Sequence, residues 1–351
     1  MERKLGFMTL DVPIDANISR FLLRAIATVA VLAAPNDAAS QFAVHRDHVF
    51  LVDQEIPGVL QVTDMASGRQ RELYRTESGL IFDFKVSPTG SMIAVTAQLL
   101  EYDVDPQVAT AKVHNRMVFE KTTLHIIGVA GNEIDAIDDV RQFSWSPDGR
   151  QLAYVTGDYR GGYEDYGNSR TWIWDLTDQS KKEISRRGYY VNWAAFDSRI
   201  YLWEKIARVA GKVYAYEPVA ESLAETPHKS IYFSPTGNYY YHPGGGIGLR
   251  ENVYVRSGDL IVKDASRVLG AFCGMRPIAW APHDDLLLLE VCRKIPGGTA
   301  AENAMLVYDP ASDMTVDAGG GESFAWGEDS TELIVKSGSR IDKRPLLKPA
   351  Q

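Results

Sequence analysis

A short pattern of residues recurs along this chain and constrains its fold more than any other feature. In each copy, a strand-forming segment with an aromatic residue precedes a tight polar turn and a second strand-forming segment. The clearest copy is Phe143-Ser-Trp-Ser-Pro-Asp-Gly-Arg-Gln-Leu-Ala-Tyr-Val-Thr156. The aromatic positions of the copies are Phe84, Trp145, Trp193, Phe233, Trp280 and Trp326, at spacings of 40 to 61 residues. Repeats of about this length that contain strands predict the blades of an all-β propeller.

The residue types of the pattern have a local physical reason. Proline presets φ for the first turn position, Asp or Thr bonds back to the backbone, and Gly accepts a positive φ. The segment therefore predicts a tight hairpin. The Phe or Trp before the turn is a bulky, rigid side chain, which suits the place where the innermost strands of neighbouring sheets pack together.

Further strand signals complete each repeat. Residues 171–177 and 181–185 follow the clearest copy and are joined by a polar turn. Four strands per repeat is the content of a propeller blade. Upstream of the first copy, residues 48–52, 58–63 and 71–74 read as the second, third and fourth strands of another unit. We therefore predict seven blades of four strands. Six blades is the alternative, if strands from the two chain ends combine in one sheet and remove its open edges.

The run Phe143-Ser-Trp-Ser-Pro-Asp-Gly-Arg-Gln-Leu-Ala-Tyr154 resembles the Pro-Asp-Gly repeat of the TolB-like β-propeller family. The resemblance covers residues 42 to 340 and implies a single propeller domain over residues 41–351, preceded by an N-terminal segment, residues 1–40. Related repeats serve translocation scaffolds, peptidase gating domains and polysaccharide lyases, so the resemblance implies a fold rather than one function. Ile173-Trp-Asp-Leu176 resembles the strand ending of WD-repeat proteins, but the chain contains no Gly-His dipeptide.

Composition and the N-terminal segment bound the partners and the compartment. The net charge of -9 and the pI near 5.4 argue against nucleic acid as a partner, because binding to phosphates needs clustered Lys and Arg. The apolar run 25–34 follows Arg20 and Arg24 and resembles the core of a secretory signal peptide. It is too short to span a bilayer. We expect a periplasmic or secreted protein; the alternative is an N-terminal helix on a cytoplasmic domain.

Insertions are distributed unevenly over the repeats. Residues 97–120, 157–170, 242–251 and 292–303 all fall between a second and a third strand, whereas the hairpins that contain proline are minimal. In a propeller, all connections between second and third strands lie on one face. Because loops carry function and tolerate length, this face is the predicted binding face.

The predicted binding residues lie in these insertions. Tyr side chains beside Gly and Asn make an adaptable recognition surface, and the alternative is a loop that packs over its own blade. No Ca²⁺-binding loop, metal-binding His spacing or phosphate-binding loop occurs, so no metal or cofactor is predicted. The candidate residues are Tyr159, Arg160, Tyr163, Tyr166, Glu101, His114 and His242.

Three functional hypotheses remain open at this point. The first is a monomeric, non-catalytic scaffold that binds a protein or a glycan. The second is a polysaccharide-acting lyase or hydrolase, with Tyr163, His242 and Glu101 converging on one pocket. The third is a gating propeller whose enzyme partner is a separate chain.

The chain contains two cysteines. Cys273 and Cys292 flank one predicted hairpin, so they either form a disulfide or pack as two free thiols.

Overall fold

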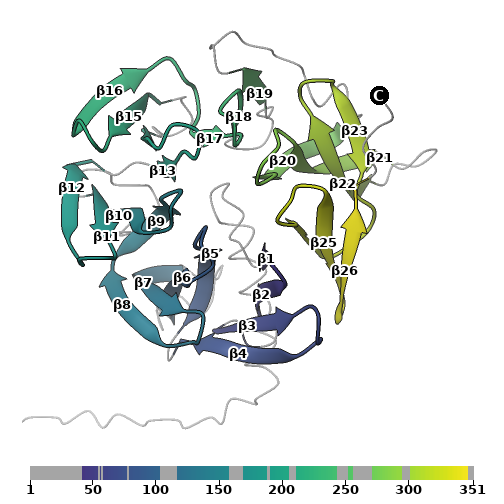
Figure 1. Ribbon diagram of the computed structural model, residues 1–351, viewed down its shortest axis with the longest axis horizontal. Coiled ribbons are helices and arrows are strands. Elements are labelled where there is room, and N and C mark those ends of the chain that lie inside the picture. The colour runs from purple at the N-terminus through teal and green to yellow at the C-terminus, as the bar shows by residue number, and fades with distance from the viewer. Residues whose placement is uncertain are drawn as a thin grey trace, which may run out of the picture.

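The computed structural model describes residues 42–346, apart from residues 54–55, 57, 77–78, 103–116, 158–168, 188–189, 205–210, 243–251, 256–270 and 295–300. Only the backbone is described for the strand residues within 99–121, 242–276 and 292–303. The described part of the chain forms 26 β-strands and no α-helix, so it contains no helix that could cross a membrane. The strands form seven antiparallel sheets arranged in a ring (Figure 1).

The strands follow the chain order within each sheet. The first two sheets contain β1 (Phe42–His45), β2 (His48–Val52), β3 (Val59–Asp64) and β4 (Gln70–Arg75), then β5 (Leu80–Val86), β6 (Met92–Tyr102), β7 (Met117–Gly128) and β8 (Glu133–Asp138). The third and fourth contain β9 (Val140–Trp145), β10 (Gln151–Thr156), β11 (Arg170–Asp175) and β12 (Lys181–Ser185), then β13 (Tyr190–Trp193), β14 (Ile200–Trp203), β15 (Val213–Glu217) and β16 (Ser222–Thr226). The fifth contains β17 (Tyr232–Phe233), β18 (Tyr239–His242) and β19 (Asn252–Val255). The sixth contains β20 (Ala271–Trp280), β21 (Leu287–Lys294), β22 (Ala301–Asp309) and β23 (Met314–Asp317), and the seventh contains β24 (Ser323–Trp326), β25 (Glu332–Ser337) and β26 (Arg340–Pro345).

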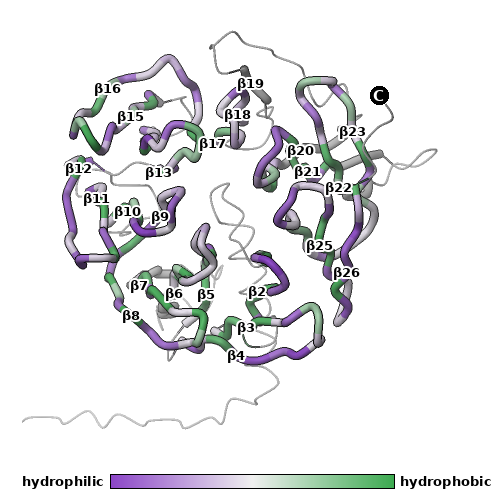
Figure 2. Tube along the Cα trace, in the orientation of Figure 1, coloured by the Kyte–Doolittle hydropathy of each residue, from purple (hydrophilic) through white to green (hydrophobic). Residues whose placement is uncertain are grey.

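Each sheet runs from the centre of the ring to its rim. The first strands, such as β5, β9 and β13, lie nearest the centre, and β4, β8, β12 and β16 lie at the rim (Figure 1). The second strands are buried along β14 and in the middle of β25, whereas the rim strands β8 and β16 are mostly exposed. Figure 2 accordingly shows hydrophilic residues along β4 and β12 and hydrophobic residues on β25. Consecutive apolar residues, whose side chains point to opposite faces in turn, thus bury both faces of the inner strands.

An apolar cluster fills every interface between neighbouring sheets. One cluster, for example, joins Phe50 and Leu60 of the first sheet to Phe84 and Ile93 of the second. Comparable clusters join the second to the third sheet, and so on around the ring. The last cluster joins Val49 and Leu51 of the first sheet to Ile334 of the seventh. The core is therefore a closed series of contacts between sheets rather than one central cluster.

The tryptophans of the repeat add hydrogen bonds between sheets. Trp145 Nε1 donates to the carbonyl of Lys85, 3.0 Å away in the preceding sheet. Trp280 Nε1 donates in the same way to Tyr232 O at 3.0 Å, and Trp326 Nε1 donates to Ala279 O at 3.1 Å. Trp193 differs, because its Nε1 donates to Ser198 O in its own hairpin. The backbone N–H of Trp193 instead donates to Ser144 Oγ of the preceding sheet at 2.9 Å.

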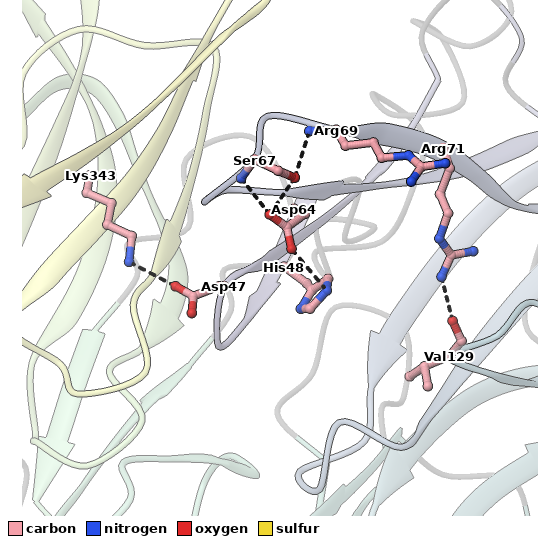
Figure 3. Close-up of polar contacts among 8 residues, drawn as sticks. All are labelled: Asp47, His48, Asp64, Ser67, Arg69, Arg71, Val129 and Lys343. Carbon is pink, nitrogen blue, oxygen red and sulfur yellow. Dashed lines mark hydrogen bonds and ion pairs between the residues drawn. The ribbon is translucent and has the colours of Figure 1, made fainter.

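The two ends of the described chain meet without exchanging strands. The first sheet consists of four consecutive strands and the seventh of three. Mixing of strands from the two ends is therefore not observed among the described residues. The strand Phe42–His45 was not predicted from the sequence; it precedes the three strands predicted for the first unit. Besides the apolar cluster, an ion pair joins Lys343 Nζ to Asp47 Oδ1 at 3.4 Å across this junction (Figure 3).

Candidate binding face

One face of the ring carries short turns that pack against each other. These turns join the first and second strands of the sheets, and we call this side the hairpin face: residues 46–47, 87–91, 146–150, 194–199, 234–238, 281–286 and 327–331. A Cβ atom on Gly149 would lie 3.2 Å from Thr89 Oγ1 of the preceding sheet, and one on Gly237 would lie 2.5 Å from Phe196 Cγ. Both glycines also have φ near +70°. The repeat therefore needs glycine for its backbone conformation and for this close approach.

Polar contacts hold the hairpin turns as well. Thr236 Oγ1 lies 2.8 and 2.6 Å from the two carboxylate oxygens of Asp285 in the next sheet. Further along, the N–H of His283 donates to Ser330 Oγ at 2.9 Å. Within one turn, the hydrogen bond from Ser146 lowers the pKa of Asp148. The hairpin face is thus built from mutual contacts between turns, which explains why these turns are minimal.

The opposite face carries the longer connections, and we call it the insertion face. The four predicted insertions join β6 to β7, β10 to β11, β18 to β19, and β21 to β22. Antiparallel pairing places all four at the edge away from the hairpin turns. Their positions between second and third strands are as the sequence predicted. Their bounds are narrower than predicted, because regular pairing continues to Tyr102 opposite Met117 and to Lys294 opposite Ala301.

The base of the Tyr-rich insertion is held by several contacts. Arg141 Nε donates to Gly157 O at 3.0 Å, and Gly157 N donates to Asp139 O at 3.1 Å. A Cβ atom on Gly157 would lie 2.5 Å from Ser169 Oγ, so the two ends of the insertion lie against each other. Ser169 is almost fully buried. The insertion therefore begins and ends at one fixed point of the third sheet.

Charged and hydroxyl groups continue from this base toward the fourth sheet. Thr171 Oγ1 donates to Arg187 O at 2.9 Å, and the guanidinium of Arg187 pairs with Glu204 at 3.2 Å. Arg170 pairs with Glu183 at 2.8 Å. These pairs are partly exposed, so each adds little to stability. They do supply a polar border of both signs beside the insertion, a suitable rim for a recognition surface.

The predicted binding residues are described only in part. Tyr159, Arg160, Tyr163, Tyr166 and His114 lie outside the described residues. The backbone of Glu101 pairs with Val118 on β7, and that of His242 pairs with Asn252 on β19. Because their side chains are not described, the predicted pocket of Glu101, Tyr163 and His242 stays a prediction.

Buried tyrosines were missed by the sequence reasoning and have a structural role. Burial raises the pKa of Tyr154 to about 12. Burial also raises the pKa of Tyr201 and Tyr308, which donate to Asp197 and Asp313 respectively, both at 2.8 Å. These acceptors lie four and five residues away, so the bonds fix local turns. Within the described ranges, no group of three or more His, Cys, Asp or Glu side chains could hold a metal ion.

Comparisons with known proteins bear on the fold. No protein-family model matches the chain, and no curated protein matches its sequence. An acylaminoacyl peptidase from Pyrococcus horikoshii is 12% identical, with a TM-score of 0.51 over 87% of this chain and 49% of that chain. A prolyl endopeptidase is 13% identical, with a TM-score of 0.52 over 94% of this chain and 55% of that chain. TolB from Acinetobacter baumannii is 10% identical, with a TM-score of 0.39 over 95% and 67%.

The chain thus spans about half the length of the two peptidases. At these identities the similarity concerns the fold alone. The all-β propeller predicted from the repeat is confirmed, and the chain is a β-propeller with TolB among the solved structures that it resembles.

Proposed function

We propose that this chain is a non-catalytic binding scaffold that captures a protein or glycan segment on the insertion face. The observation that carries the proposal is the contrast between the two faces. The turns of the hairpin face pack against each other, whereas the insertion face carries the longest connections between neighbouring strands of one sheet. Binding residues are commonly carried on loops that a rigid scaffold positions.

The base of residues 158–168 supports this proposal. Its flanking residues Gly157 and Ser169 lie in contact. Arg141 Nε donates to the carbonyl of Gly157, and Thr156 Oγ1 accepts a hydrogen bond from Trp172 Nε1. These contacts fix the point from which the insertion leaves the third sheet, as expected of a binding loop that a rigid scaffold positions. The polar border formed by Arg170, Arg187 and their partners would surround the contact. We further propose that the protein is monomeric and periplasmic or secreted, in line with the apolar run 25–34.

Shortening the Tyr-rich insertion tests the proposal. Replacing residues 158–168 by a Gly-Ser link should leave the free energy of unfolding within about 1 kcal/mol of the wild type, as expected for a surface loop. Cross-linking in the native cell-envelope fraction, followed by mass spectrometry, should then lose the partner that the wild type captures. The matched control is Val219→Ser in the turn between β15 and β16, because this side chain is 93% exposed and lies at the other face. The control should keep the partner.

Two results would contradict the proposal. A loss of several kcal/mol in the shortened variant would mean that the insertion is a structural part of the third sheet. Unchanged capture by a stably folded variant would mean that the insertion is not the binding site.

A second candidate function is docking onto an enzyme carried by a separate chain. The observation that favours it is that solved structures with TM-scores above 0.5 include peptidases about twice as long as this chain. Cross-linking distinguishes the candidates through the identity of the partner. A hydrolase bound through either face would favour docking, and a non-enzymatic protein or a glycan bound through residues 158–168 would favour the scaffold.

A further inference from the structure

The junction between the first and last sheets contains a histidine in an unusual place. His45 ends β1 and pairs with His48 across a two-residue turn, in which Arg46 has a φ of 52°. Ala43, two residues earlier on the same side of β1, packs against the cluster shared with the second sheet. Phe42 and Val44, on the other side, pack against the cluster shared with the seventh sheet. Because side chains point to opposite faces in turn along a strand, His45 lies on the same face as Ala43 and is directed toward the second sheet.

The second sheet has a glycine where this imidazole arrives. Gly90 lies in the turn between β5 and β6 with a φ of +70°, and a Cβ atom there would lie 2.0 Å from His45 Nε2. This is the tightest of the close approaches between hairpin turns. His45 Nε2 is buried and has no hydrogen-bond partner among the described residues. The imidazole thus fills the space that Gly90 leaves, with one ring nitrogen facing no described acceptor.

The charges around His45 come from two hairpin turns. Burial lowers the pKa of His45 below its ordinary value of 6.5, and the charges of Arg46 and His48 lower it further. Glu328, in the turn between β24 and β25 of the last sheet, acts in the opposite direction. Residues 87–91 of the β5–β6 turn are Ser, Pro, Thr, Gly and Ser, so this turn contributes no titratable side chain.

The neighbouring charged groups of the turn have their own partners. Asp47 pairs with Lys343, and His48 Nε2 lies 3.9 Å from Asp64 Oδ2 (Figure 3). Asp64 is in turn held by the N–H and hydroxyl of Ser67 at 2.7 and 2.8 Å. Both pairs lie at the exposed surface, so neither supplies a buried acceptor for His45.

We propose that His45 is a pH-sensitive contact between the first and second sheets, stable only while its imidazole is neutral. Protonation adds a proton and a positive charge to a ring packed against Gly90, where burying a charge without an acceptor is unfavourable. In acid, the ring must leave its place or remain there at a cost, and either outcome weakens the contact between the sheets. The contact requires no ligand and no partner chain.

The sign of the pH dependence follows from linkage. Because the folded-state pKa of His45 is lowered, the unfolded chain binds more protons than the folded chain at this site between the folded-state pKa and about pH 6.5. The contribution of His45 to the free energy of unfolding is therefore fully present above this pH. It decreases as the pH falls from about 6.5 toward the folded-state pKa, and it is constant below that value.

Urea unfolding of the full chain between pH 7.5 and pH 5 tests the proposal. The comparison is between the wild type and His45→Gln, with His48→Gln as the control in the same turn. Removing the titrating group at position 45 should make the decline in stability toward pH 5 shallower than in the wild type. The His48→Gln control should keep the contribution of His45 to this decline in stability. Equal slopes for the wild type and His45→Gln would overturn the proposal.

A second measurement applies even if His45→Gln fails to fold. The imidazole Cε1–H signal of His45 in the folded wild type should titrate with a midpoint below 6.5. In Glu328→Gln the midpoint should move lower still, because the charge that favours protonation is gone. A midpoint at or above 6.5, or no movement in Glu328→Gln, would overturn the proposal.

Discussion

Tryptophan at the repeat position does more than fill space between sheets. Each of Trp145, Trp280 and Trp326 directs its Nε1–H to a main-chain carbonyl of the preceding sheet. A first strand at the centre of the ring has one edge without a neighbouring strand, so its carbonyls need other donors. Phenylalanine occupies the same position in two copies, Phe84 and Phe233, and cannot make this bond. The repeat position thus tolerates either residue for packing but only Trp for the bond between sheets.

Replacing these donors measures what the bonds contribute. Trp145→Phe and Trp326→Phe should each lower the free energy of unfolding by about 0.5–1.5 kcal/mol, because a partly buried carbonyl loses its indole donor. The two residues lie at different interfaces, so the double variant should show nearly the sum of the single effects. Urea unfolding of the three variants gives these values. Trp172→Phe is the control for loss of an indole donor within one sheet, since its Nε1 bonds Thr156 Oγ1. Unchanged stability in Trp145→Phe would mean that the carbonyl is equally well solvated.

At the residue scale, local chemistry was predictable and contacts between repeats were not. The sequence alone indicated that Gly149 and Gly237 adopt positive φ, because their turns demand it. It could not indicate that each of them lies against a side chain about 40 to 60 residues earlier, namely Thr89 and Phe196. That information depends on how neighbouring sheets are placed. The same reason explains why the role of His45 has no signature in its own segment.

At the element scale, the bounds of strands depended on pairing across long connections. The segments ending at Tyr102 and beginning at Met117 continue a regular hairpin beyond the predicted insertion bounds. Leu99, Leu100 and Tyr102 are strand-forming residues, but alternation is lost near Glu101, and so the sequence alone placed the end earlier. In the last sheet, the exposure of a strand follows its place at the rim rather than its number in the sheet. β26 is polar and largely exposed like the fourth strands elsewhere, although it is the third strand of its sheet.

The pairing of β20 with β21 brings the two cysteines of the chain into neighbouring register positions. Cys292 pairs with Gly274, and the register shift between Ala271 and Gly274 leaves Cys273 in a bulge. Simple pairing around the turn predicts residue 292 opposite about residue 275, so the observed register brings Cys292 one residue closer to Cys273. If the protein is exported, we predict a disulfide that contributes about 3 kcal/mol by closing a loop of about twenty residues.

Mass spectrometry under thiol-blocking conditions decides between a bridge and two thiols. Protein from the native envelope fraction should contain one peptide pair joined through Cys273 and Cys292. Recovery of two alkylated cysteines would contradict the bridge, and Cys273→Ser should then leave the melting temperature unchanged. A cytosolic location would remove the reason for expecting the bond.

At the scale of the whole molecule, the ring is closed by packing rather than by a shared sheet. Val49 and Leu51 of the first sheet meet Ile334 of the last, all at or below 8% exposure. The seventh sheet also covers Ala281 and Leu288 of the sixth. It therefore contributes to two interfaces at once. Because each sheet is stabilised mainly by its neighbours, we expect the ring to unfold as one cooperative unit.

Removing the last sheet should consequently disrupt both interfaces. Deleting residues 323–351 would uncover apolar side chains on the first and sixth sheets and a new open sheet face, so we expect unfolding or aggregation.

Ile334→Ala is the milder test, because it removes only atoms at the junction between the first and last sheets. It should lower the free energy of unfolding by about 2–5 kcal/mol while keeping a single transition. Calorimetry and size-exclusion chromatography measure both outcomes. A soluble, monomeric truncated protein with unchanged melting would show that closure is dispensable, and two separate transitions in Ile334→Ala would show that the sheets unfold independently.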